Sequence, residues 1–363
     1  MQNALLEKRL KSLKTIIGSD DQALLLTNEK NIGYFCGFFH SEGYLLVTEN
    51  ETVLFVDFRY YEAALKKSSC CKVVCFTKLF KDLISEVKNN SVVKVLFEAS
   101  NITVEKYSRF KKAFSENGIE CICNGTLDDK IDNIRCIKDE SEIEKIAKAQ
   151  EITEKSYLEV LNYLKPGVSE RRIALELEHL IKLNGGEGVS FDLITITGKK
   201  TSLPHGVPSD DIVSEGDFFT FDIGSIFEGY HSDTTRTVAI KSASEEMRKV
   251  YDIVLKAQLA VLDGVKPGAK CSDVDKIARD IISENGYGKY FGHATGHGVG
   301  LDIHESPVVS PRSETVLKKG MIITDEPGIY LPEKFGVRIE DMLCVTENGY
   351  KNFVTLPKEL IIV

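Results

Sequence analysis

The chain has 363 residues, of which 42% are hydrophobic and 28% charged, and its formal net charge is −9. These proportions are ordinary for globular proteins, and the length exceeds what one hydrophobic core usually organises, so two domains are expected. The negative charge argues against a nucleic-acid surface, which needs a basic stripe. No apolar run approaches membrane-spanning length. From the charge and the apolar pattern together, neither a nucleic acid nor a membrane is expected as a partner.

The cysteines and the first residues bear on the compartment. Nine cysteines, an odd number, show none of the spacings of a zinc knuckle. We interpret them as reduced, mostly buried thiols of a cytoplasmic protein. The opening segment MQNALLEKRLKSLK places Leu6, Leu10 and Leu13 on one helical face, and Glu7 interrupts any continuous apolar stretch. This segment is therefore expected to be an ordinary first helix and not a secretory signal.

The first part of the chain alternates β-rich runs with helical stretches. The β-rich runs are ALLLT from Ala23, GYLLVT from Gly43, TVLFVD from Thr52, CKVVCF from Cys71 and VVKVLFEA from Val92. Helical stretches lie around residues 60–67, 80–88 and 104–116. The polar stretch NGTLDDKIDNIRCIKD then follows as a connector. This alternation predicts an α/β domain over residues 1–127 and a second domain over residues 128–363.

The second domain begins with two helices. The first starts with Ser141 and Glu144 as a capping box and stops at Lys165-Pro166-Gly167. The second is expected from Ser169 to Asn184. The same signals return further on, where a helix capped by Ser244 also stops at a Lys-Pro-Gly sequence and another helix follows. The helix pair is thus repeated.

The strands that follow each helix pair also resemble one another. PSDDIVSEGDFFTFDIG, from Pro208, matches PRSETVLKKGMIITDEPG, from Pro311, in the spacing of a glycine and a carboxylate. Such a repeat predicts two related halves about a pseudo-twofold axis, with Asp222 and Glu326 in corresponding positions facing one centre. The alternative is a chance likeness of two α+β segments, because few residues match one by one.

Four carboxylates lie at the ends of predicted strands. FFTFDIGSIFEGYHSDTTRTV, from Phe218, has the pattern of two strands with a short connection, which would bring Asp222 and Asp233 side by side. Glu326 ends an apolar run before a Pro-Gly turn. In VRIED, alternation places Glu340 on the same strand face as Arg338. Taken singly, each could instead be a solvent-facing carboxylate, or, for Glu340, half of a salt bridge with Arg338.

Three of the seven histidines lie in FGHATGHGVGLDIHESP, from Phe291, at His293, His297 and His304. The glycines let backbone pass close to another group, and no Gly-Lys-Ser/Thr follows that would make a phosphate loop. A single histidine here would most often be a core residue. Three in one glycine-rich stretch indicate a site.

Together these residues form a set of metal donors with four carboxylates and one imidazole: Asp222, Asp233, His297, Glu326 and Glu340. The set is too anionic for a single zinc ion, which takes about four ligands with more nitrogen or sulfur. Oxygen-rich sites suit harder cations such as Mn²⁺. Two divalent cations would balance four carboxylates, and paired metals are a known device for hydrolysis.

These motifs resemble those of the pita-bread metallopeptidases, the family of aminopeptidase P, prolidase and methionine aminopeptidase. DIGSIFEGYHSDTTRT is similar to its two-aspartate hairpin, TGHGVGLDIHE to its histidine motif, and EPGIY and VRIED to its two glutamate motifs. LPHGVPSD, from Leu203, resembles a histidine motif of the proline-specific branch, and NIGYFCGFFHSEGYLLVT, from Asn31, and FVDFRYYEAA, from Phe55, resemble the N-terminal domain of aminopeptidase P and prolidase. The resemblance implies an α/β N-terminal domain followed by an α+β pita-bread catalytic domain.

The resemblance also implies how the donor set is used. Asp222 would bind one metal ion, His297 and Glu326 the other, and Asp233 and Glu340 would bridge them. The two ions are expected to be Mn²⁺, with Co²⁺ or Zn²⁺ as alternatives.

The remaining site residues take roles from the same resemblance. Glu326 would also handle the proton of a shared water, and His304 would stabilise the oxyanion and the leaving group. His205 would line the proline side of the site, and Arg338 would hold the downstream end of the peptide. His293 receives no role.

One residue departs from the family pattern. The position before the first glutamate is usually apolar in this family, and here it is Asp325. By alternation Asp325 should point away from the metals, and a basic partner is expected behind the site.

The function implied is hydrolysis of the bond before a proline in second position of short peptides. We interpret the chain as an Xaa-Pro aminopeptidase, with Xaa-Pro dipeptidase (prolidase) as the alternative, because both branches share the metal motifs. A metal-free binding module of the same fold is a further alternative, against which the intact donor set weighs. The N-terminal domain argues against methionine aminopeptidase and implies a homodimer.

Overall fold

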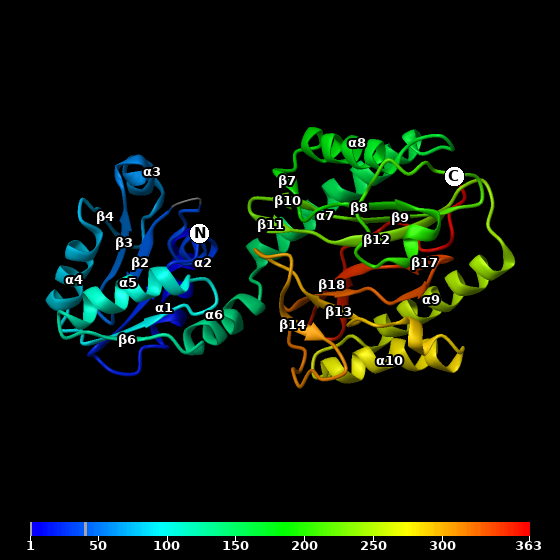
Figure 1. Cartoon of the computed structure of the whole chain (residues 1–363). Coiled ribbons are helices and arrows are strands. Elements are labelled where there is room, and N and C mark those ends of the chain that lie inside the picture. Colours follow the sequence, from blue (N-terminus) through cyan, green and yellow to red (C-terminus); the bar gives the residue numbers. More distant parts are fainter. Residues whose placement is uncertain (1, 40–41) are drawn as a thin grey trace. The chain divides into compact units, whose positions relative to one another are not determined.

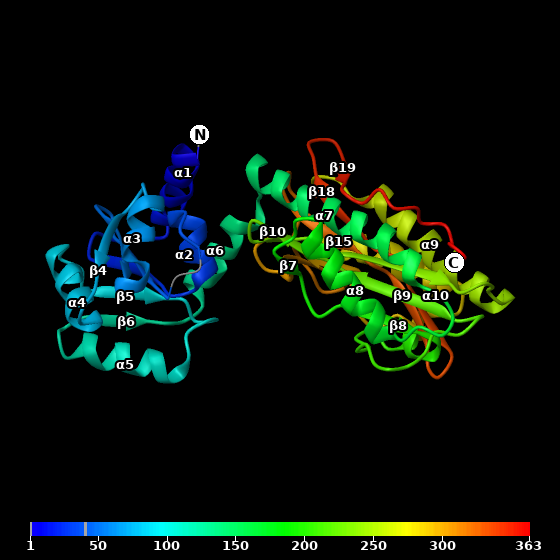
Figure 2. The same ribbon diagram turned by 90° about the horizontal axis from the view of Figure 1, so that it is seen from above.

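The computed structural model describes residues 2–39 and 42–363. The chain divides into two compact units, Met1–Arg135 and Cys136–Val363 (Figures 1 and 2). The boundary predicted between residues 127 and 128 falls inside helix α6 (Thr126–Cys136). His40 and Ser41, which belong to the N-terminal segment that resembles the family, and Met1 lie outside the described residues.

The first unit is built on a mixed six-stranded sheet with the strand order β4-β3-β2-β1-β5-β6. β2 pairs antiparallel with β1 and β3, and the other neighbours are parallel. The central strands are continuous apolar runs because helices cover the sheet. The strands are β1 (Gln22–Leu26), β2 (Tyr44–Val47), β3 (Thr52–Val56), β4 (Lys72–Cys75), β5 (Lys94–Phe97) and β6 (Glu120–Ile122).

The helices of this unit confirm the α/β expectation. The predicted first helix is α1, and its leucines at positions 6, 10 and 13 are buried. Two helices were not predicted: α2, and α6, which occupies the stretch expected to be a polar connector. The helices are α1 (Gln2–Lys14), α2 (Glu29–Cys36), α3 (Phe58–Lys67), α4 (Leu79–Asn89), α5 (Val104–Ser115) and α6.

The second unit contains two helix pairs and several antiparallel sheets. The pairs are α7 (Glu140–Val160) with α8 (Glu170–Leu183), and α9 (Glu245–Gly264) with α10 (Cys271–Glu284). Within this unit the two pairs lie on opposite sides of the strands (Figure 1). This is the architecture of two related halves expected from the repeat. No helix in the described part of the chain has the length and apolar character needed to cross a bilayer.

The sheets of the second unit are short. Their strand orders are β12-β9-β8, β11-β10-β7, β14-β13-β15-β18-β19 and β16-β17. The strands of the first half are β7 (Gly188–Val189), β8 (Ile194–Thr197), β9 (Phe218–Ile223), β10 (Ser225–Phe227), β11 (Tyr230–His231) and β12 (Thr234–Ala239). Those of the second half are β13 (Gly296–Gly298), β14 (Glu305–Val309), β15 (Ile322–Asp325), β16 (Gly328–Leu331), β17 (Phe335–Arg338), β18 (Asp341–Val345) and β19 (Tyr350–Asn352). Three short 3₁₀ helices complete the unit: Leu161–Tyr163, Gly198–Ser202 and Gly288–Tyr290.

The start of α7 differs from the prediction. The capping box is made by Asp139 and Glu142, and not by Ser141 and Glu144. The side chain of Asp139 accepts hydrogen bonds from the N–H groups of Ser141 and Glu142, and Glu142 Oε2 accepts one from the N–H of Asp139. An aspartate cap with a glutamate three residues on serves the first turn as well as a serine would.

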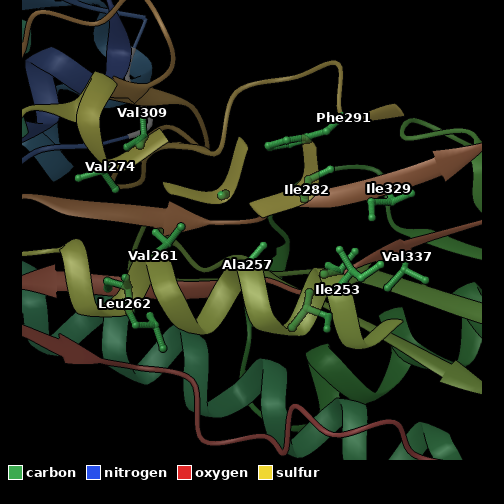
Figure 3. Close-up of a cluster of buried hydrophobic side chains, with 14 of the residues drawn as sticks. Ile253, Ala257, Val261, Leu262, Val274, Ile282, Phe291, Val309, Ile329 and Val337 are labelled. Carbon is green, nitrogen blue, oxygen red and sulfur yellow. The ribbon is translucent and has the colours of Figure 1, made fainter. Parts of the chain in front are cut away.

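The main core of the second unit lies between the second helix pair and the strands. Ile253, Ala257 and Val261 project from α9, Val274 and Ile282 from α10, toward strand residues such as Ile329 and Val337 (Figure 3). Because one face of the strands is packed in this way, side chains that alternate with the core residues must point to the other face. That opposite face carries the polar residues described next.

Candidate metal centre

Asp222 and Asp233 are brought together by the pairing of β9 with β12. In this antiparallel ladder Asp222 lies opposite Thr235, and Thr234 lies opposite Ile223. Asp233 directly precedes β12 and therefore lies at the same end of the ladder. The side chain of Asp222 is 14% exposed, and that of Asp233 is 6% exposed.

His297 and Glu326 are held together by β13 and β15. The two backbones approach so closely at Gly296 that a Cβ there would lie 2.0 Å from the carbonyl oxygen of Thr324. The hydroxyl of Thr324 accepts a hydrogen bond from the His297 N–H at 3.1 Å and donates one to Glu326 Oε1 at 3.3 Å. The N–H of Glu326 donates to the carbonyl of Thr295 at 2.8 Å. A glycine and a threonine thus fix both donors.

The imidazole of His297 has one nitrogen available for a metal. Nδ1 lies 3.0 Å from the carbonyl oxygen of Gly298, which can only accept, so Nδ1 carries the hydrogen. Nε2 then holds a lone pair and lies 3.5 Å from both Asp233 Oδ2 and Glu326 Oε1. Burial lowers the pKa of His297 to about 4, so the ring is neutral. A neutral imidazole oriented through its other nitrogen is the form that binds metals.

Glu340 reaches the same point from the break between β17 and β18. The hydroxyl of Thr235 donates to Glu340 Oε2 at 2.7 Å, and the N–H of Glu340 donates to the Thr235 carbonyl at 3.1 Å. One donor atom each from Asp233, His297 and Glu340 lies within 4.8 Å of the others. The structure thus places three members of the predicted donor set in one cluster, with Glu326 beside His297.

The carboxylates of this cluster are buried close to one another, which disfavours their charged forms. Burial is the main cause that raises the pKa of Asp233 and Glu340 well above the ordinary range and that of Glu326 to about 8. Repulsion from neighbouring carboxylates, Asp222 included, adds to it. Asp233 Oδ1 is buried and has no hydrogen-bond partner among the described residues. Such an arrangement is costly without a cation, so the residues fit divalent metal ions.

Arg338 forms an ion pair with Asp222. Its Nη2 donates to Asp222 Oδ2 at 2.5 Å, its Nε to the Thr235 hydroxyl at 3.1 Å, and its Nη1 to the Tyr330 hydroxyl at 2.8 Å. The side chain is 5% exposed. Arg338 thus forms its ion pair with Asp222 and not with Glu340, the alternative partner on its strand face. That Arg338 holds the downstream end of a peptide stays a prediction.

Tyr330 and His293 extend this set of hydrogen bonds. His293 Nδ1 lies 2.7 Å from the carbonyl of Ala294 and must donate to it, so Nε2, at 2.9 Å from the Tyr330 hydroxyl, accepts. Burial lowers the pKa of His293 to about 4. His293, Tyr330, Arg338 and Asp222 therefore form a continuous chain of hydrogen bonds. Tyr330 belongs to the EPGIY motif, from which no role for it was predicted.

Two exposed histidines border the cluster. The ring of His304 lies 4.5 Å from that of His297, centroid to centroid, at an interplanar angle of 64°. His205 follows Pro204, whose carbonyl lies 3.4 Å from Arg338 Nη1. Both predicted histidines are thus next to residues of the cluster and can be reached from solvent.

Asp325 faces away from the cluster, as alternation predicts. It is fully buried and lies opposite Asp341 in the β15–β18 ladder. Lys358 lies near it, but the ion pair of Lys358 is with Asp341, at 2.6 Å. Burial, with the charge of Asp341, raises the pKa of Asp325 well above the ordinary range. The basic residue expected to pair with Asp325 therefore forms its ion pair with Asp341.

Comparison with known proteins assigns each part of the chain to a known family. Residues 144–347 match the metallopeptidase family M24, and residues 9–137 match the creatinase/prolidase N-terminal domain. A protein named Xaa-Pro dipeptidase from Pyrococcus furiosus is 39% identical over 360 residues, which cover 98% of this chain and 100% of that protein.

Two solved structures are similar to this chain over nearly its full length. One described as an Xaa-Pro dipeptidase from Bacillus anthracis has a TM-score of 0.94 and 38% identity, over 99% of this chain and 100% of that chain. One described as an X-Pro aminopeptidase from Thermotoga maritima has a TM-score of 0.90 and 35% identity, over 97% of this chain and 99% of that chain.

Metal binding is expected to release protons. Because its pKa is raised to about 8, Glu326 holds a proton at neutral pH that a divalent cation must displace, and the pKa values of Asp233 and Glu340 are raised in the same direction. The neutral His297 contributes none. Titration calorimetry of Mn²⁺ into apo-protein at neutral pH, in buffers of different ionisation enthalpy, should show about one proton or more released per chain. The affinity should rise with pH, and Glu326→Gln should release fewer protons. Binding without proton release would contradict this description of the carboxylates.

Proposed function

The chain belongs to metallopeptidase family M24, and from that premise we propose that it is an Xaa-Pro dipeptidase that uses two divalent metal ions. The observation that carries the proposal is the convergence of Asp233, His297 and Glu340, with Glu326 beside them, in a chain similar over nearly its full length to Xaa-Pro dipeptidases.

The comparisons support the dipeptidase better than the aminopeptidase predicted from the sequence. Proteins named Xaa-Pro dipeptidase or prolidase recur among the similar sequences and structures, at 37–39% identity. The X-Pro aminopeptidase from Thermotoga maritima is also similar, which is why the metal motifs alone do not decide. The Xaa-Pro aminopeptidase becomes the second candidate.

The proposed ligands are the five residues predicted from the sequence: Asp222, Asp233, His297, Glu326 and Glu340. We propose Mn²⁺, with Co²⁺ or Zn²⁺ as alternatives, because oxygen donors predominate. Bound there, two divalent ions would lower the pKa of a shared water and polarise the scissile carbonyl.

The protein's own groups complete the proposed reaction. Glu326, between the metal donors and the hydroxyl of Thr324, would accept the proton of the attacking water. His304, in ring contact with His297 and exposed, would donate to the charge that develops on the carbonyl oxygen. Arg338 and Thr235 would hold Asp222 and Glu340 in place through the bonds described above.

Proline explains the proposed specificity. Its nitrogen carries no hydrogen and its ring fixes φ, so a site for it needs walls that fit the ring. His205 and His304 are the exposed side chains proposed for these walls. A dipeptidase must in addition recognise the free carboxylate of the proline, which an aminopeptidase does not need.

The deciding experiment compares Ala-Pro, Ala-Pro-amide and Ala-Pro-Ala as substrates of the Mn²⁺-loaded protein. We expect kcat/KM for Ala-Pro to exceed the other two by about tenfold or more, a difference of ~1.4 kcal/mol, because only Ala-Pro presents a carboxylate on the proline. A chelator should abolish the activity and Mn²⁺ should restore it.

Each other outcome favours a different function. Faster cleavage of Ala-Pro-Ala would establish the aminopeptidase. Turnover of Met-Ala alone would exclude both proline-specific activities. A folded protein that retains and takes up no metal would indicate the metal-free binding module.

We also propose a homodimer that uses the surface of α3. This helix buries only Ala64 and leaves Phe58 83% and Leu65 54% exposed. Phe58→Asp should lower the mass measured by light scattering from that of a dimer to that of a monomer. Val104→Asp, at a position on α5 that is also 83% exposed, controls for the added charge. A monomeric parent protein would refute the proposal.

A further inference from the structure

The exposed ring of His304 needs support from the turn that carries it. His304 lies between β13 and β14, where the pairing shifts register between His297 and Gly298. In this irregular stretch Gly298 lies opposite Glu305, the residue after His304. The position of the His304 ring over His297 therefore depends on how the turn from Gly300 to Glu305 is held.

The carboxylate of Glu305 holds this turn from inside. Its Oε1 accepts a hydrogen bond from the N–H of Asp302 at 3.0 Å, and the N–H of Gly300 donates to the carbonyl of Asp302 at 3.0 Å. The turn closes so tightly over the carboxylate that a Cβ on Gly300 would lie 2.5 Å from Glu305 Oε2. A side chain at position 300 would have to displace this carboxylate.

The other oxygen of Glu305 is paired with a lysine from the start of the second unit. Lys138 Nζ lies 3.0 Å from Glu305 Oε2, and the two side chains are 1% and 8% exposed. The backbone of Lys138 is fixed as well, because its N–H donates to the carbonyl of Gly320 at 2.9 Å. Gly320 in turn donates to the carbonyl of Val345, at the end of β18. The lysine thus links the histidine turn to the sheet of β15, which leads into Glu326.

A buried ion pair of this kind is weak evidence for stability, because the cost of removing both charges from water offsets their attraction. Its geometry is nevertheless strict, since both charges are largely removed from water. We propose that the Lys138–Glu305 ion pair positions His304 against the metal donors. Both are positioning residues: they act through His304, and the inference rests on the function proposed above for that histidine.

The test compares four variants of the full chain loaded with Mn²⁺. Lys138→Met and Glu305→Gln should each lower kcat for Ala-Pro by between about tenfold and a hundredfold, with little change in KM or metal content, because a catalytic group is displaced. Lys138→Arg keeps the cation and should restore most of kcat. Lys319→Met removes the same charge from the exposed pair with Glu347 and should leave kcat unchanged.

A second measurement does not depend on activity. In the Zn²⁺-loaded protein with ¹³C-labelled histidine, the His304 resonance, assigned by its absence from His304→Gln, should shift in Glu305→Gln while that of His297 stays in place. Unchanged kcat, a loss of kcat with an unmoved His304 resonance, or a loss that tracks lost metal would each overturn the proposal. If Lys138→Met fails to fold, Glu305→Gln decides. If the parent protein does not cleave Ala-Pro, the proposed function fails, and the resonance still decides the positioning.

Discussion

The repulsion between buried carboxylates is the constraint on which the rest of the catalytic unit depends. Asp233 and Glu340 lie almost entirely out of water, with Glu326 and Asp222 close enough for their charges to raise the pKa of both. The fold relieves part of this repulsion with neutral or cationic partners. Arg338 pairs with Asp222, Thr235 donates to Glu340, and Thr324 donates to Glu326. The remaining charge, with the Asp233 oxygen that has no hydrogen-bond partner in the described part of the chain, is what the proposed cations would balance.

The strands carry this polar surface because their other face is held by a large apolar core and by a second buried charge layer. Behind the site, the guanidinium of Arg236 is 2% exposed, lies 2.9 Å from Asp341 Oδ1 and also donates to the carbonyl of Glu340 at 2.6 Å. Lys358 shares Asp341. The backbone that presents Glu340 is therefore fixed from behind by Arg236, while its carboxylate is fixed from the front by Thr235.

Residue type and local spacing were sufficient to predict much of this site. Aspartates and glutamates at strand ends, with three histidines among glycines, led to the donor set, and the structure places Asp233, His297, Glu326 and Glu340 near one another. The partners of those residues could not be predicted. Arg338 bonds to Asp222, and Tyr330 bonds to His293, although the partners lie far apart in sequence. These bonds depend on how β9, β12, β16 and β17 are placed.

The errors in the predicted secondary structure have causes in the nearby sequence. The capping box was placed at Ser141 because serine and glutamate at that spacing are a common signal, whereas Asp139 with Glu142 gives the same signal two residues earlier. Helix α6 was missed because its exposed face makes the sequence polar, although Leu127 and Ile131 are buried at helical spacing. The choice between dipeptidase and aminopeptidase is of another kind, because the metal motifs are common to both.

Anomalous diffraction at the manganese edge, from crystals grown with Mn²⁺, tests most directly whether the buried carboxylates hold two metal ions. We expect two peaks per chain, roughly 3.5–4 Å apart, with Asp222 at one, His297 and Glu326 at the other, and Asp233 and Glu340 between them. A single peak, or peaks that leave Asp233 and Glu340 without a metal, would contradict this expectation.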